Sequence, residues 1–406
     1  MNELWRSPTL RSVVIYAVSG IGFVGANLLL ARLLPTGEYG LFTLVVALIH
    51  LGYALASSGL DGVVNRRHLE AGPWLFRRSL GAALMVGMAL TLVAGITYQL
   101  KIPMLLAVLV STAAGGAMMV AAAKFQSEQR FGISLALSQS PNFVLILAAL
   151  AVALSHQQEA WLPVLISAAG FVVAAILGWQ LLFRERGARP GGQSSFSWGE
   201  AFSFAGLNAA GTVLVQLDRL IIPQVLSVHD LATYGVLAAI AGSMFRVLSM
   251  GVGYTMVPRL RAADGILERR RLIGYEAKLV GAIVVAGSVV IWFITPLLEA
   301  WFLAGKYQLA GSLVLAVLVA GTAKIANAFT KAIVSALATP GELSLVNLLG
   351  WGSVALAVLA GVLGARWGLV GVIYGVALGW VMRALAYFFI ALRHLKLPAT
   401  VPAPAR

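Results

Sequence analysis

The chain contains no cysteine and few acidic residues, and both shortages narrow its chemistry. Of its 406 residues, 15 are Asp or Glu, against 29 Lys and Arg, and none is Cys. Without thiols the chain can form no disulfide and no thiolate metal site. Its five histidines are scattered, no glycine-rich phosphate loop is present, and Asp218 alone among the acids lies well inside an apolar stretch. The sequence therefore indicates no metal centre and no machinery for hydrolysis or primary pumping, and we expect no enzymatic activity.

Long apolar stretches dominate the chain instead. It is 60% hydrophobic with a mean hydropathy of +0.90, which lies outside the range of soluble domains. A run of about twenty apolar residues crosses a hydrocarbon core of about 30 Å, and these runs do not alternate as barrel strands do. The sequence predicts an all-α integral membrane protein with about twelve transmembrane helices, at residues 10–30, 39–60, 79–100, 103–123, 131–154, 161–183, 201–225, 234–257, 279–295, 310–333, 343–364 and 367–392.

The distribution of positive charge orients these spans. Most Lys and Arg residues fall at the N-terminus, at the C-terminus and in every second loop, and the opposite loops hold only Arg32, Lys101, Lys306 and Arg366. By the positive-inside rule both termini are cytoplasmic, which requires an even number of spans. The formal net charge of +14 is thus a topological signal that can sit against anionic lipid headgroups. We expect no nucleic-acid partner.

The two halves of the chain repeat one pattern. A short loop with an acid precedes Tyr39-Gly40 in the first half and Tyr234-Gly235 in the second, at an offset of 195 residues. We expect these pairs to be interfacial anchors and helix-packing positions. Six spans per half give parallel repeats, related by an axis along the membrane normal. The sequence therefore predicts two six-helix lobes around a central cleft: a first lobe at 1–183, a cytoplasmic linker at 184–200, a second lobe at 201–392 and a cytoplasmic tail at 393–406.

Several motifs resemble one family of carriers. They are Ala31-Arg32-Leu33-Leu34-Pro35-Thr36-Gly37-Glu38-Tyr39-Gly40-Leu41-Phe42, then Ser58-Gly59-Leu60-Asp61, then Leu217-Asp218-Arg219-Leu220, and finally Tyr307 to Gly311 leading to Val334-Ser335-Ala336-Leu337. Over nearly the whole chain the sequence resembles the polysaccharide (lipid-linked oligosaccharide, O-antigen-type) flippases of the multidrug/oligosaccharidyl-lipid/polysaccharide exporter superfamily.

This resemblance implies a function and a location. A flippase of that family moves an undecaprenyl-diphosphate-linked oligosaccharide from the cytoplasmic to the outer leaflet of the bacterial inner membrane, by alternating access, with the first, second, seventh and eighth spans lining the cleft. The expected partners are the lipid-linked oligosaccharide, membrane lipids and the polysaccharide polymerase and glycosyltransferases of the same pathway. We expect a monomer with no cofactor, coupled to protons or sodium if it is coupled at all.

Basic and polar side chains inside the spans mark the expected site. A charge at the bilayer centre costs about 2.5–3.5 kcal/mol, so such residues should face the bundle interior or water. At 100° per residue they form stripes on the spans at 201–225 and 310–333. Arginine suits bidentate phosphate contacts, although Arg219 and Lys331 could instead extend to a membrane interface. The predicted substrate-binding residues are Arg246, Lys324, Arg219, Arg383, Lys331, Asn208, Gln216 and Asn327.

Two titratable residues are candidates for ion coupling. Asp218 either pairs with Arg246 structurally or takes up a proton or sodium ion. His50, in the middle of the second span, is either a protonation switch or a hydrogen-bonded structural residue. Two other functions stay open: a drug or small-molecule antiporter of the same superfamily, which would need carboxylates in the cleft, and a non-catalytic membrane scaffold in envelope assembly, which would need no polar stripes.

Overall fold

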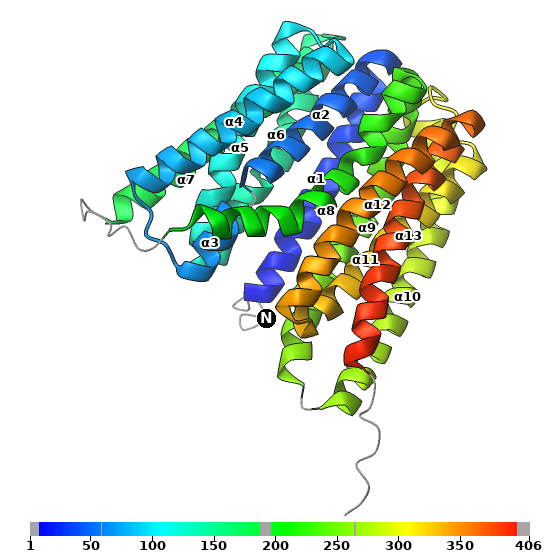
Figure 1. The fold of residues 1–406 in the computed structure, drawn as a ribbon. Coiled ribbons are helices and arrows are strands. Elements are labelled where there is room, and N and C mark those ends of the chain that lie inside the picture. The colour runs from blue at the N-terminus through cyan, green and yellow to red at the C-terminus, as the bar shows by residue number, and fades with distance from the viewer. Residues whose placement is uncertain (1–7, 58, 187–195, 264, 396–406) are drawn as a thin grey trace, which may run out of the picture. The chain divides into compact units, whose positions relative to one another are not determined.

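The computed structural model describes residues 8–57, 59–186, 196–263 and 265–395, and within these ranges helices are joined by short loops (Figure 1). Within these ranges there are twelve long helices and one short one, α3. The helices are α1 Pro8–Leu33, α2 Thr36–Ser57, α3 Leu60–Arg67, α4 Pro73–Tyr98, α5 Ile102–Ser127, α6 Phe131–Ser155, α7 Trp161–Arg186, α8 Trp198–Val225, α9 Val228–Ala262, α10 Ile266–Leu297, α11 Gly311–Leu337, α12 Pro340–Gly364 and α13 Gly368–His394, with short turns η2 Leu298–Phe302 and η3 Ala365–Trp367.

Each long helix corresponds to one of the predicted spans. Most helix ends lie within a few residues of the predicted span ends. Eight stretches of the described residues are long and apolar enough to cross a membrane, and one of them, Ser344–His394, covers both α12 and α13. Shorter apolar helices at Val18–Leu33 and Val228–Gly242 belong to α1 and α9. The predicted fold class, an all-α protein with about twelve membrane helices, is confirmed.

Contacts divide the chain into two compact units. Unit 1 consists of residues 1–239 and 299–308, and unit 2 of residues 240–298 and 309–406. The division falls inside α9, whereas the sequence predicts a lobe boundary at 184–200. The difference arises because α8 packs on α2 and α3 and so belongs with the N-terminal helices. This division reflects which helices pack together and does not test whether the chain arose by duplication. The six-plus-six repeat therefore stays a prediction.

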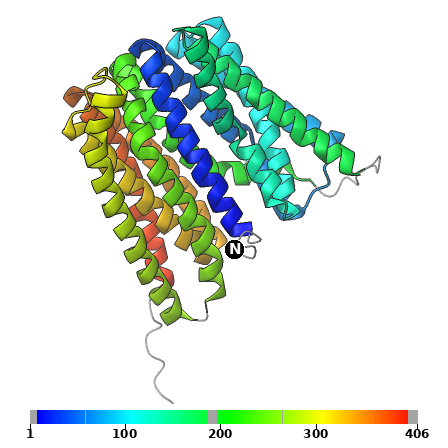
Figure 2. The same ribbon diagram turned by 180° about the vertical axis from the view of Figure 1, so that it is seen from behind.

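Small residues allow close helix packing in both units. In unit 1, α5 packs on α2, α4, α6 and α7, and a Cβ added at Gly116 would lie 2.8 Å from the Cβ atoms of Ala56 and Ala83. In unit 2, α13 packs on α11 and α12, and a Cβ at Gly379 would lie 2.6 Å from the carbonyl oxygen of Ser353. Figure 2 shows the same helices from behind. Such close approach is the usual basis of helix association in membranes, where burial from water contributes little.

The Ser-Gly-Leu-Asp motif after α2 has a structural role. Gly59 has φ 95°, and a Cβ there would lie 2.0 Å from the carbonyl oxygen of Ala201. Only glycine adopts this conformation at such a contact. The Asp61 carboxylate accepts hydrogen bonds from the backbone N–H groups of Gly59 and Gly62, at 3.0 and 2.8 Å. Burial nevertheless raises the pKa of Asp61 above its ordinary value. The motif therefore ends α2, begins α3 and seats the first turn of α8.

The loop after η2 joins unit 1 through the end of α1. Lys306 Nζ donates hydrogen bonds to the carbonyl oxygens of Ala31 at 2.9 Å, of Arg32 at 3.4 Å and of Leu34. Tyr307, buried, donates through Oη to Ala31 O at 3.0 Å. The last carbonyls of a helix have no partner within the helix and carry partial negative charge, so a lysine there both satisfies and neutralises them. Burial of Lys306 lowers the pKa of its ammonium group.

Candidate substrate site

A buried polar cluster in unit 1 contains the predicted Asp218 and Arg219. Tyr234 Oη on α9 donates a hydrogen bond of 2.6 Å to Asp218 Oδ2 on α8, and both residues are buried. Arg219 Nη1 donates to Gln216 Oε1 at 2.9 Å, so these two share a face of α8 as predicted. Arg219 forms no ion pair with another described residue.

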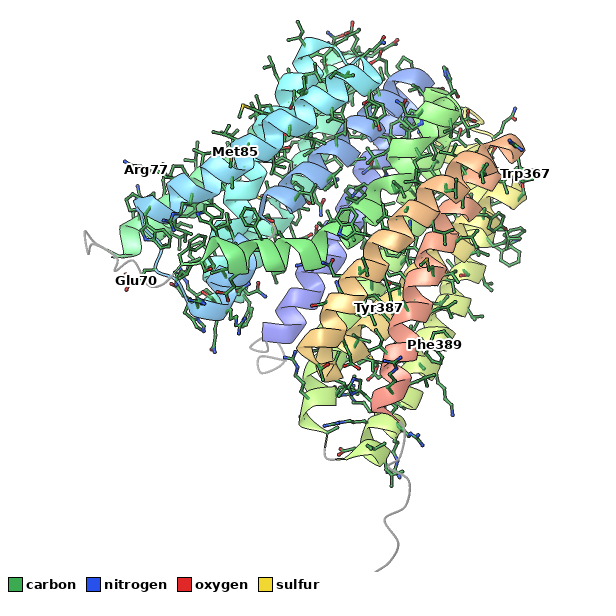
Figure 3. The ribbon with its side chains drawn as sticks, viewed as in Figure 1. Glu70, Arg77, Met85, Trp367, Tyr387 and Phe389 are labelled. Carbon is green, nitrogen blue, oxygen red and sulfur yellow. The ribbon has the colours of Figure 1, made fainter. Side chains whose placement is uncertain are left out.

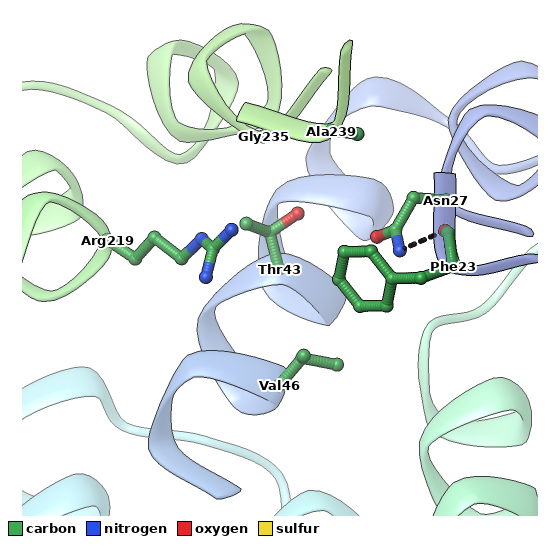
Figure 4. A pocket seen from close by; sticks show the side chains of 7 residues that line it. All are labelled: Phe23, Asn27, Thr43, Val46, Arg219, Gly235 and Ala239. Atoms are coloured by element: carbon green, nitrogen blue, oxygen red, sulfur yellow. Dashed lines mark hydrogen bonds between the residues drawn. The ribbon is translucent and has the colours of Figure 1, made fainter. Parts of the chain in front are cut away.

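Arg219 points into a small pocket within unit 1 (Figure 4). The pocket is small and partly open, and its lining comes from α1, α2, α8 and α9. These are the first, second, seventh and eighth long helices, the four that the family resemblance assigns to the cleft. The lining residues are Phe23, Asn27, Thr43, Val46, Arg219, Gly235 and Ala239. The donors of Asn27 and Thr43 are engaged by carbonyl oxygens of their own helices, so the arginine is the group that can bind a ligand by charge.

The repeated Tyr-Gly pairs pack against the same region. A Cβ at Gly40 would lie 2.2 Å from the carbonyl oxygen of Val228, and one at Gly235 would lie 2.7 Å from Thr43 Oγ1. The prediction that these are helix-packing positions is confirmed, because no side chain fits where α2 and α9 touch. The prediction of interfacial anchors is wrong. Tyr39 is 0% and Tyr234 6% exposed, so protein surrounds both rings.

Unit 2 holds a second basic cluster, formed by α11 and α13. Arg383 is 3% exposed and donates through Nη2 to Tyr387 Oη at 3.2 Å; Tyr387 is labelled on α13 in Figure 3. Lys331 is exposed on α11, the helix that packs against α13. Lys324 Nζ lies 5.8 Å from the centroid of the Trp380 ring, within the range of a cation–π contact. The predicted stripe on α11 and the arginine of the last span are thus brought together.

The other predicted residues are distributed as follows. Asn327 is buried on α11 and Asn208 is exposed on α8. The ring of His50 lies 5.5 Å from that of Tyr53, edge to face. The side chain of Arg246 lies outside the described part of the structure, so its predicted pairing with Asp218 stays a prediction. Among the described residues, no group of three or more His, Asp or Glu side chains could hold a metal ion.

Sequence reasoning missed two tyrosines. Tyr234 bonds Asp218 and Tyr387 bonds Arg383. The second was accessible from spacing, since Tyr387 follows Arg383 by four residues and shares its helix face. The bond between Tyr234 and Asp218 joins two helices, α9 and α8. The sequence repeat pointed to Tyr234 but gave no indication of its partner.

Comparison with known proteins identifies the fold. No family model matches the chain, and no curated protein does. An inward-facing multidrug resistance MATE family transporter of the MOP superfamily is 13% identical, with a TM-score of 0.65 over 94% of this chain and 98% of that one. The lipid II flippase MurJ, in an inward closed conformation, is 9% identical, with a TM-score of 0.67 over 93% and 86%. The chain has the fold of these transporters. An outward-facing MATE transporter, 15% identical, gives a TM-score of 0.62 over 97% of both chains.

The likeness concerns the fold and not one substrate. At 9–15% identity the MATE and MurJ structures share this architecture, and they are named as transporters and a flippase, not as enzymes. The resemblance drawn from the sequence motifs is therefore supported at the level of the fold alone. Which molecule the chain carries must be argued from its own residues.

Proposed function

We propose that this chain is a flippase that moves an undecaprenyl-diphosphate-linked oligosaccharide to the outer leaflet of the bacterial inner membrane, for synthesis of cell-envelope polysaccharide. The observation that carries the proposal is the sign of the buried charge. Arg383 and Arg219 form no ion pair with another described residue. Asp218, the one fully buried acid in the part of the chain that the structure describes, accepts a hydrogen bond from Tyr234. An interior of this sign attracts a diphosphate and repels cations.

The pocket suggests where the diphosphate is first held. Arg219 presents a planar guanidinium at the junction of α1, α2, α8 and α9, and such a group binds phosphate oxygens in pairs. The pocket is far smaller than a lipid-linked oligosaccharide, so the helices around it must separate during transport. Gly40 and Gly235 let α2 and α9 touch without interlocking side chains, which suits surfaces that part and close again in alternating access.

The proposal includes a setting for the protein. Both termini lie in the cytoplasm, and the chain works as a monomer in the inner membrane. Glycosyltransferases supply its substrate and a polymerase consumes the product on the other side. Asp218 and His50 are the candidates for coupling to a proton or sodium gradient.

A drug antiporter is the second candidate function. MATE multidrug transporters have this fold, and the buried Asp218 carboxylate adjoins Arg219 in sequence. A cationic drug would need that carboxylate free of its bond to Tyr234 and would meet the Arg219 charge in the pocket. The balance of charge in the described interior therefore favours the anionic substrate.

A reconstituted flipping assay tests the proposal. Purified protein in liposomes would be given a fluorescent undecaprenyl-diphosphate oligosaccharide, and the label reaching the outer leaflet would be measured with a membrane-impermeant quencher. Wild type should flip the lipid, and Arg219→Gln should slow flipping by about tenfold or more, because a charged hydrogen bond to phosphate contributes about 1.5–3 kcal/mol. Arg366→Gln, at an exposed position, is the matched control and should leave the rate unchanged. No flipping by folded wild type would refute the proposal.

A further inference from the structure

Arg383 in unit 2 is a buried cation that no described residue supplies with an anion. Its side chain is 3% exposed, and its Nε and Nη1 have no hydrogen-bond partner, while Nη2 donates to Tyr387. Neither Arg383 nor Lys331 forms an ion pair with a described residue. A buried charge left without a counter-charge is strongly destabilising. Water could satisfy the N–H groups but could not balance the charge.

The surroundings of Arg383 add an unpaired donor and a second positive charge, and no described carboxylate pairs with either cation. Trp380, one turn before Arg383 on the same face of α13, is also buried, and its Nε1 has no hydrogen-bond partner. Lys331 adds a second positive charge on α11, the helix that packs along α13. Two positive charges on packed helices, with unpaired N–H groups at Arg383 and Trp380, are the arrangement that an anion stabilises.

This cluster is placed away from lipid-like surfaces. Along α11, Lys324, Asn327 and Lys331 lie roughly opposite Leu315 and Val319 at 100° per residue. Leu315 and Val319 are 49% and 42% exposed and apolar, as expected of a surface that faces hydrocarbon. Arg383 stands eleven residues before the end of α13 at His394, about 16 Å along the helix. Its charge therefore cannot be relieved by extension to an interface.

We propose that Arg383 and Lys331 form a binding site for a phosphate-bearing anion between α11 and α13. The site is built from residues of unit 2 alone, and under the proposed function, on which this assignment rests, its ligand is the diphosphate of the lipid-linked substrate. Arg383 supplies paired donors from its guanidinium edge, and Lys331 supplies a mobile point charge at the exposed rim. A phospholipid headgroup has the same phosphate chemistry, so the experiment separates the two sources.

The test measures binding, not transport. Detergent-solubilised full-length protein would be titrated with inorganic pyrophosphate, with thermal unfolding as the readout. The titration is made in an Arg219→Gln background, so that the pocket of unit 1 does not contribute. Pyrophosphate should stabilise this background, and its apparent affinity should fall on the order of tenfold to a hundredfold when Arg383→Gln or Lys331→Gln is added. Arg366→Gln, exposed on the turn between α12 and α13, should leave the affinity of this background unchanged. Without pyrophosphate, Arg383→Gln should be at least as stable as wild type, because the variant removes an unpaired charge.

The outcomes separate the site from the function. Unchanged pyrophosphate affinity in both variants overturns the site. Loss of stability in Arg383→Gln without ligand also overturns it, since Arg383 would then be a structural residue. Competition by undecaprenyl diphosphate far stronger than by phosphatidylglycerol supports the substrate assignment, and equal competition overturns that assignment in favour of a lipid headgroup. Pyrophosphate binding that depends on Arg383, in a protein that flips nothing, would uphold the site while refuting the proposed function.

Discussion

The bond between Tyr234 and Asp218 should be a measurable link between α8 and α9. Tyr234→Phe removes one donor, 2.6 Å from a carboxylate in a site where both residues are less than 7% exposed. A hydrogen bond to a charged group contributes about 1.5–3 kcal/mol in soluble proteins, whereas interhelical bonds in membranes average about 0.6 kcal/mol, with a maximum near 1.7. For an ionised Asp218 we expect a coupling energy of about 1–2 kcal/mol.

A double-mutant cycle with Tyr234→Phe and Asp218→Asn, followed by unfolding in mixed detergent micelles, measures that coupling. Tyr98→Phe is the matched control, because Tyr98 Oη also donates between helices but to a neutral acceptor, Leu220 O at 2.9 Å. Its loss should cost only about 0.6 kcal/mol. A coupling energy within about 0.3 kcal/mol of zero, the limit of simple additivity, would refute the claim that this bond joins the two helices.

Three further predictions concern other parts of the fold. Gly40→Ala should destabilise by about 1–3 kcal/mol, because its Cβ would lie 2.2 Å from a backbone oxygen. A Cβ added at Gly25 would have no heavy atom within 4 Å, so Gly25→Ala should be neutral or slightly stabilising when unfolding is measured in mixed detergent micelles. Lys306→Met should cost about 1.5–3 kcal/mol by freeing carbonyls at the end of α1, whereas Lys101→Met, at an exposed ion pair, should cost at most about 1 kcal/mol. Glu342, before the membrane stretch that begins at Ser344, has its pKa lowered to about 2, first by the backbone N–H of Thr339 and then by His394.

The Glu342 shift has a definite sign. Because its pKa is lower in the folded than in the unfolded protein, its stabilising effect is complete above the ordinary value and disappears as pH falls toward 2. Thermal unfolding of wild type and Glu342→Gln should therefore differ at pH 7 and converge in acid. A difference that grew on acidification would contradict this assignment. An equal loss of stability in Gly40→Ala and Gly25→Ala would contradict the packing argument. An equal loss in Lys306→Met and Lys101→Met would contradict the argument that Lys306 caps α1.

The sequence predicted most of the fold and part of the site. The spans were predictable because membrane thickness sets helix length, and all twelve reappear as long helices. The helix-packing role of Gly40 and Gly235 followed from their repeat. The unit boundary within α9 was not predictable, because it depends on α8 packing against α2 and α3. The contacts of Lys306 with the end of α1 could not be predicted, because its acceptors lie more than 270 residues earlier in the sequence.

The sign of the carried charge is the central claim, and one paired measurement tests it most directly. Wild-type protein in liposomes with an imposed proton or sodium gradient would be offered, in parallel, a fluorescent undecaprenyl-diphosphate oligosaccharide and a fluorescent cationic drug. A basic interior with its buried acid bonded to Tyr234 predicts that the lipid-linked anion is flipped and the drug is not moved. Gradient-driven movement of the drug, without flipping of the lipid, would contradict it.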